Sequence, residues 1–70
     1  MTPAEHSTLV FLLQAIEVIP EKASDLIALA RGKSSSTDYY SILRRLQNLL
    51  DTPEELIRTC QTIRLVLRTT

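Results

Sequence analysis

Few residues of this 70-residue chain belong to the types that perform catalysis. His6 falls in the first turn of the first expected helix, where we interpret it as a solvated side chain. Cys60 lies on an apolar stripe, where a cysteine behaves as a small buried hydrophobe. Glu54 and Glu55 begin a helix, and the helix dipole favours acidic residues there. These interpretations predict a protein that is not an enzyme.

Metal and cofactor sites are not predicted either. One cysteine and one histidine cannot form a ligand cluster with zinc-site spacing. A single glycine leaves no glycine-rich loop that could bind a phosphate group. We therefore predict no metal, no cofactor and no catalytic residue.

The arginines raise the question of DNA binding. The charges balance, with eight basic and eight acidic residues, so no overall field attracts nucleic acid. A DNA-reading helix would also carry polar side chains, whereas the segment after Pro53 is mostly apolar and rich in threonine. We interpret the arginines as solvated helix faces; the set that DNA binding would use is Arg44, Arg45, Arg58, Arg64 and Arg68.

Two adjacent tyrosines, Tyr39 and Tyr40, have more than one interpretation. They could mark a ligand pocket. Alternatively, one ring packs across a helical hairpin while the other lies on the surface. Tyrosine also suits a protein interface, because it combines apolar area with a polar tip.

The composition and the start signals favour helices. The motif T-P-x-E occurs at residues 2–5 and again at 52–55, with a threonine at the N-cap, a proline at the first helical position and a glutamate completing a capping box. Arg31 and Gly32 end a helix, with glycine suited to the left-handed position after it. Ser35 or Ser36 is expected to cap the next helix.

Apolar residues recur at helical spacing on both sides of the polar loop at 33–36. The first stripe runs through Leu9, Leu12, Leu13, Ile16 and Ile19. A short loop between striped segments predicts antiparallel neighbours. We therefore predict an all-α fold, a single small domain over residues 1–70, built as an antiparallel helical hairpin with three to four helical segments. Its arms are notched at Pro20 and Pro53, and whether these prolines kink or end their helices stays open. The predicted seam contains Leu12, Ile16, Leu26, Ile27, Leu43, Leu46, Leu50, Ile57 and Cys60.

Some apolar residues lie off these stripes. Val10, Phe11 and Val18 in the first arm, with Leu65 and Val66 in the last segment, would be exposed on a hairpin that has one seam. They favour a protein-binding role. The predicted interface comprises Leu9, Val10, Phe11, Leu13, Tyr40, Leu65 and Val66. The alternative is a compact three- or four-helix bundle that folds the surplus residues inward.

The run "TLVFLLQAIEVI" is too short for a membrane span and has no basic residues before it, as a signal peptide would. The single cysteine fits a reducing compartment. We predict a soluble, cytoplasmic protein without a membrane span.

Residues 26–50, "LIALARGKSSSTDYYSILRRLQNLL", combine a helix ending in "LARG", a polar loop, a tyrosine at the next helix start and a Leu/Gln-rich helix. This order resembles the small co-chaperones of type III secretion needle subunits, the YscE, PscE and SsaE group. The resemblance implies an antiparallel helical hairpin that binds a helical-repeat partner chaperone. Together the two would keep the needle subunit soluble in the bacterial cytoplasm before export.

Three functions stay open at this stage. The first is an adaptor that binds another small helical protein, as a co-chaperone does. The second is a self-associating helical bundle, such as a homodimer, with a structural or regulatory role. The third is a small nucleic-acid-binding regulator, which the balanced charge disfavours.

Overall fold

The computed structural model describes residues 1–33 and 36–69. Within these residues the chain forms four α-helices and one short 3-10 helix, and no strand. The helices are α1 (Pro3–Val18), η1 (Pro20–Lys22), α2 (Ala23–Arg31), α3 (Thr37–Gln47) and α4 (Pro53–Thr69). The all-α prediction is confirmed.

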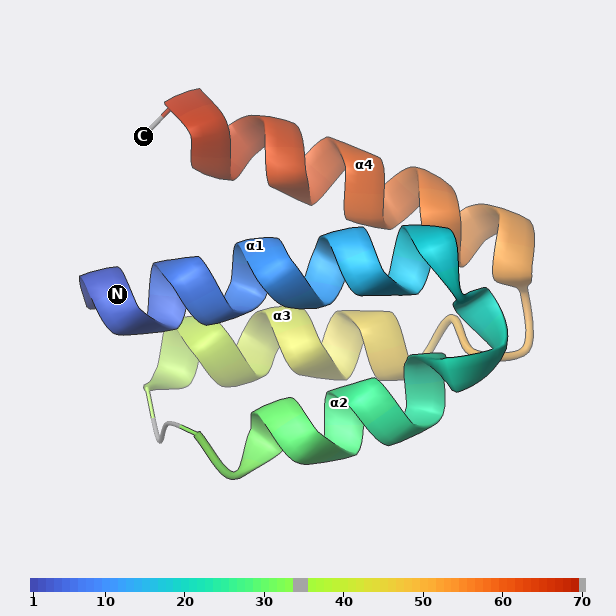
Figure 1. Cartoon of the computed structure of the whole chain (residues 1–70), viewed down its shortest axis with the longest axis horizontal. Helices are drawn as coiled ribbons and strands as arrows, with labels where there is room; N and C mark the ends of the chain where they lie inside the picture. The colour runs from blue at the N-terminus through green and yellow to red at the C-terminus, as the bar shows by residue number, and fades with distance from the viewer. Residues whose placement is uncertain (34–35, 70) are drawn as a thin grey trace.

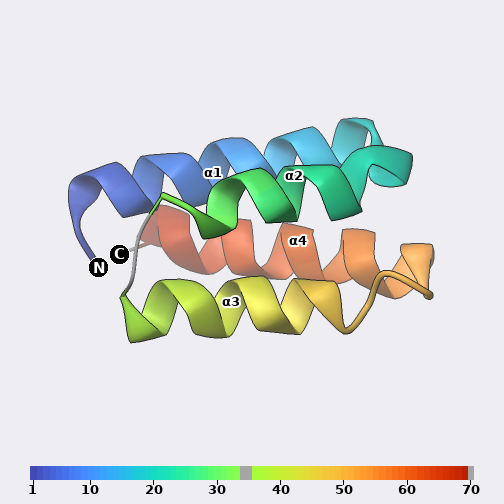
Figure 2. The same cartoon turned by 90° about the horizontal axis from the view of Figure 1, so that it is seen from below.

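The four α-helices pack as a bundle in which each helix runs antiparallel to the one before it (Figure 1). Helix α1 packs most extensively against α4 and then against α2, while α2 also contacts α3 and α3 contacts α4. Viewed from below, the four helices lie roughly along one direction, and both ends of the chain lie at the same end of the bundle (Figure 2). The molecule measures 28 × 25 × 17 Å along its principal axes.

Both internal prolines begin a new helix. Helix α1 ends at Val18, and Ile19 leaves the helical region with φ −131° and ψ 74°, because a following proline disfavours helical geometry. Pro20 then starts η1, after which α2 runs back along α1. Pro53 is the first residue of α4. The stretch from α2 to α3 forms an antiparallel helical hairpin, and α1 and α4 complete a bundle on it.

The two T-P-x-E motifs behave differently. The Glu5 amide donates to Thr2 Oγ1 at 3.2 Å and the Thr2 amide donates to Glu5 Oε1 at 2.8 Å, so the first capping box forms as predicted. The second motif also precedes a helix, but the Thr52 hydroxyl donates to the Leu49 carbonyl at 3.2 Å. The loop before α4 uses that hydroxyl locally, and the predicted second capping box does not form.

The cap predictions around the polar loop need one correction. Gly32 has φ −80° and ψ −2°, a right-handed conformation rather than the predicted left-handed one. The amide of Lys33 donates to the Ala30 carbonyl at 3.1 Å, so a tight 3-10 turn ends α2 without a left-handed residue. Ser36 is the N-cap residue of α3, and Ser35 lies outside the described residues.

The core lies between all four helices. Most of the predicted seam is buried in it, although Leu26 and Leu50 are only partly buried at its edge and Ile57 is partly exposed. The buried apolar residues are Leu9, Leu12, Leu13, Ile16, Ala23, Ile27, Ala30, Tyr39, Leu43, Leu46, Leu56, Cys60 and Leu67.

Candidate protein-binding surface

The residues predicted to form an interface fall into different environments. Leu9 and Leu13 are 0% exposed and belong to the core, so they are not available to a partner of the folded chain. The reason is that α1 contacts both α4 and α2, and a helix between two neighbours buries a wider face than one hairpin seam requires. Val10 is partly buried and packs against the core. Phe11 is 71% exposed, as the prediction requires.

Two polar contacts identify the side of α1 that faces α4. His6 Nε2 lies 2.9 Å from the Leu67 carbonyl oxygen, and Glu17 Oε1 lies 3.3 Å from Arg64 Nη2. These contacts place His6 and Glu17 on the α4 side. Residues of α1 that lie away from the core, from α4 and from α2 point to solvent.

The outward face of α1 is apolar or uncharged. Ser7, Phe11, Gln14 and Val18 recur at three- and four-residue spacing, so they share one face, and all four are exposed. Val18 is 78% exposed. The two acidic residues of the helix lie elsewhere, since Glu5 is in the capping box and Glu17 faces α4.

Helix α2 adds a large apolar side chain next to this face. Ser24 and Arg31 border a hollow with Gln47 of α3, so they mark the side of α2 that faces α3. Leu29 lies on the other side, toward α1, and is 70% exposed. Helices α1 and α2 lie side by side on one surface, with α3 behind them (Figure 1).

We call this region the α1–α2 apolar surface, defined by Phe11, Val18, Ile19 and Leu29. The sequence pattern did not indicate Leu29 as a surface residue, and it placed Ile19 on the core stripe. Ile19 follows the last residue of α1 and is 45% exposed, because the chain leaves the helix before it. Leu29 could have been found from its position off the stripe of Leu26, Ile27 and Ala30.

The other predicted interface residues do not join this surface. Leu65 and Val66 are exposed on α4. Val66 borders a hollow with Met1 and Pro3 at the end of the bundle. Tyr40 borders a groove between α2 and α3. The predicted interface residues therefore lie at three separate places: on α1, on α4 and, for Tyr40, beside the groove between α2 and α3.

The tyrosine pair connects α3 to the end of α2. Tyr39 is fully buried and its hydroxyl donates to the Ala30 carbonyl at 2.6 Å, while the partly exposed Tyr40 donates to the Arg31 carbonyl at 2.8 Å. The two rings meet edge to face at 6.3 Å. Burial, with smaller contributions from Glu5 and Tyr40, raises the pKa of Tyr39. One ring thus packs across the hairpin and the other lies at the surface, as one interpretation of the sequence predicted.

The residues with catalytic potential occupy structural positions. Cys60 is fully buried, and its pKa is raised from 9.0 to about 11, mainly by burial, with Glu17 adding to the effect and Arg64 opposing it. At neutral pH this thiol is protonated and a poor nucleophile. His6 contacts a backbone carbonyl of α4. No group of three potential metal ligands occurs within residues 1–33 and 36–69.

Comparison with protein-family models, curated proteins and solved structures finds no match to the chain. None of the helices in the described part of the chain is both long enough and apolar enough to span a membrane. The fold class is an all-α bundle, and large apolar side chains are exposed on its α1 and α2 helices.

Proposed function

We propose that this protein is a non-enzymatic adaptor that binds another small helical protein through the α1–α2 apolar surface. The observation that carries the proposal is the exposure of Phe11, Val18 and Leu29, each at least 70% exposed on neighbouring helices. Covering a side chain of this size stabilises a complex by roughly 1.5–3 kcal/mol. A partner would therefore gain from covering these residues together.

The chemistry of the surface describes its partner. Phe11 and Val18 lie on an uncharged face of α1, so a partner would lose no hydration of charged groups there. Helices α1 and α2 lie side by side and run antiparallel (Figure 1). Two neighbouring helices of this kind suit a partner helix with an apolar stripe. We expect such a helix to lie along α1 and contact Phe11, Val18 and Leu29.

The resemblance of residues 26–50 makes the proposal more specific. We propose a co-chaperone of the type III secretion class, which would act with a partner chaperone to keep a needle subunit soluble in the bacterial cytoplasm before export. Leu29 of the proposed contact surface belongs to the stretch that carries the resemblance. A partner chaperone built from helical repeats would offer a helix with the apolar stripe that this surface suits.

Self-association is the second candidate function. It is favoured by the distribution of small and large side chains along the outward face of α1. Small side chains, Ala4 and Ser7, occupy one end of this exposed face, and the larger Phe11 and Val18 follow. In an antiparallel pair of two copies, Val18 of each copy would face Ala4 of the other, with Phe11 near the two-fold axis. Such a face is self-complementary in size.

The first test changes Phe11 to Glu and compares it with Gln61→Glu, which places the same residue at an exposed position on α4. We expect Phe11→Glu to abolish recovery of the partner from the native cell, because a carboxylate would be buried without a counter-charge. Gln61→Glu should recover the partner at the wild-type level. Quantitative mass spectrometry of the captured proteins gives the comparison. Both variants should keep wild-type helix content by circular dichroism.

Light scattering over a concentration series separates the two candidates. An adaptor is expected to be a monomer on its own. A wild-type dimer that Phe11→Glu converts to a monomer would replace the adaptor proposal with self-association. Loss of helix content in Phe11→Glu would contradict both, since it would show that Phe11 supports the fold. For the co-chaperone proposal, the captured set must contain a helical-repeat protein or a needle subunit.

A further inference from the structure

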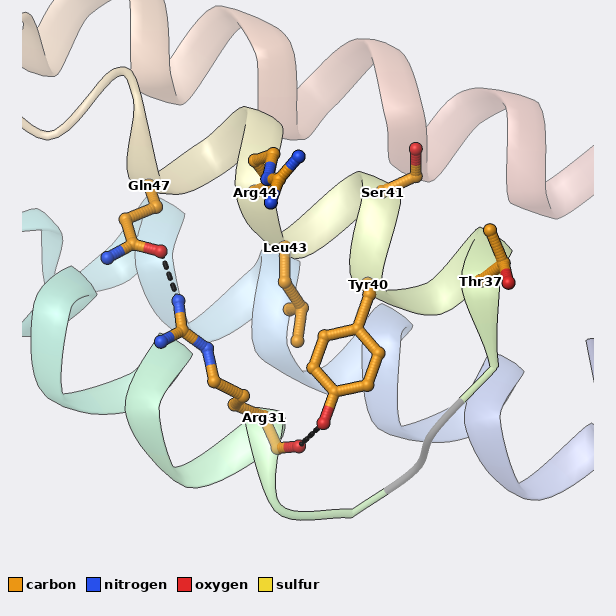
Figure 3. Close-up of a pocket in the computed structure, with 7 residues that line it drawn as sticks. All are labelled: Arg31, Thr37, Tyr40, Ser41, Leu43, Arg44 and Gln47. Carbon is orange, nitrogen blue, oxygen red and sulfur yellow. Dashed lines mark hydrogen bonds between the residues drawn. The ribbon is translucent and has the colours of Figure 1, made fainter.

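A polar groove of about 560 Å³ lies between α2 and α3, away from the α1–α2 apolar surface. Figure 3 shows Arg31, Tyr40 and Gln47 arranged around Leu43, with Arg44 on α3 and with Thr37 and Ser41 nearer the start of α3. Every polar side chain that borders the groove is a hydrogen-bond donor, and none is a carboxylate.

Two hydrogen bonds hold Arg31 in this groove. Its Nη2 donates to Gln47 Oε1, so the guanidinium bridges from the end of α2 to α3. Its backbone carbonyl accepts from the Tyr40 hydroxyl at 2.8 Å. The bridge leaves the other guanidinium nitrogens of Arg31 available as donors.

Arg44 is a second positively charged residue that borders the groove. It lies three residues before Gln47, hence one turn along the same side of α3. The ion pairs found among the described residues use Arg58 and Arg64, and neither Arg31 nor Arg44 takes part in one. The groove thus collects two guanidinium groups with no counter-charge in its wall.

We propose that this groove binds a small oxyanion, a carboxylate or a phosphate, between Arg31 and Arg44. Guanidinium groups donate paired hydrogen bonds to both kinds of oxyanion. The apolar Leu43 lies between Arg31 and Tyr40, and Thr37 and Ser41 border the groove nearer the start of α3. The site is independent of the proposed adaptor function and uses none of the residues of the α1–α2 apolar surface.

The test is a titration of the full chain, labelled with ¹⁵N, with sodium phosphate and separately with sodium glutarate, at an ionic strength held constant with sodium chloride. We expect saturable amide shifts at the end of α2 and in the last turn of α3, where Arg31 and Arg44 lie. Arg44→Gln should weaken binding about tenfold, because it removes one charged donor. Arg45→Gln is the matched control: it lies next in sequence, is exposed in the same last turn and does not border the groove.

The tighter of the two anions identifies the chemical source, phosphate or carboxylate. Shifts that do not saturate, or that sodium chloride alone reproduces, would overturn the proposal. Equal weakening by Arg44→Gln and Arg45→Gln would also overturn it, because it would indicate a response to overall charge. Phe11→Glu should bind the anion as the wild type does, so a failure of the adaptor proposal leaves this site standing. Circular dichroism confirms that each variant is folded.

Discussion

At the scale of single residues, the two tyrosines show how neighbours in sequence take different roles. Tyr39 enters the core on the face of α3 that also carries Leu43 and Leu46, whereas Tyr40 is turned about 100° away and borders the polar groove. Both hydroxyls nevertheless donate to carbonyls at the end of α2. The pair therefore fixes the α2–α3 connection with one buried bond and one exposed bond.

Replacing Tyr39 with Phe tests the buried bond. We expect the free energy of unfolding to fall by about 1 kcal/mol, because the Ala30 carbonyl loses a short buried hydrogen bond but keeps a backbone donor, Lys33. Tyr40→Phe is the control and should change stability by less than about 0.5 kcal/mol, because water can replace its exposed bond. Urea denaturation followed by circular dichroism measures both. Equal losses would mean that burial does not distinguish the two bonds.

At the scale of elements, the helix starts are set by local chemistry to different degrees. Thr2 and Glu5 satisfy one another's backbone amides at the start of α1. Thr52 occupies the same position in its motif but directs its hydroxyl back to Leu49. The proline at the first helical position is common to both motifs, so it is the shared signal of a helix start.

The difference predicts unequal effects of removing the two hydroxyls. Thr2→Ala is expected to destabilise the protein by about 1 kcal/mol, because it removes the acceptor for the Glu5 amide. Thr52→Ala should cost less than half as much, since its hydroxyl caps no helix amide. The comparison uses the free energy of unfolding, and hydrogen exchange at the Glu5 amide should accelerate only in Thr2→Ala. A larger loss in Thr52→Ala would contradict this account.

At the scale of the whole molecule, polar contacts between α1 and α4 help to close the bundle. His6 contacts the Leu67 carbonyl near one end, and the Glu17–Arg64 ion pair lies toward the other. The Glu17 side chain is only 14% exposed, and its Oε2 is buried without a hydrogen-bond partner within the described residues. Arg64 is therefore the group that compensates a largely buried carboxylate.

Removing the positive charge of Arg64 should lower the free energy of unfolding. We expect Arg64→Met to lower the free energy of unfolding by about 2 kcal/mol, less than for a fully buried pair because Arg64 is partly exposed. Adding Glu17→Gln to this variant should restore part of the loss, since a neutral amide is easier to bury. Arg58→Met, which breaks the exposed pair with Glu55, should cost less than about 0.5 kcal/mol. A double variant less stable than Arg64→Met would contradict the role assigned to Arg64.

Much of the fold can be predicted from local patterns in the sequence. The apolar spacing of Leu12, Ile16 and Leu43 indicates helices and their buried faces, because a helical period assigns each residue to a face. Pro20 and Pro53 indicate interruptions, because proline lacks an amide and restricts the residue before it. Helix starts, the polar loop and most of the core follow from these signals.

The tertiary structure decided how those faces are covered. A period identifies the face of a helix but not the number of neighbours that pack against it, so Leu9 and Leu13 are buried once α1 lies between α2 and α4. The reversal of the chain at Pro20 lays α2 beside α1 (Figure 1), and helical spacing then puts Leu29 on the side of α2 away from α3. The sequence by itself determined the helices and their apolar residues. The packing of the bundle decided which of those residues remain exposed, because burial depends on contacts between segments distant in the chain.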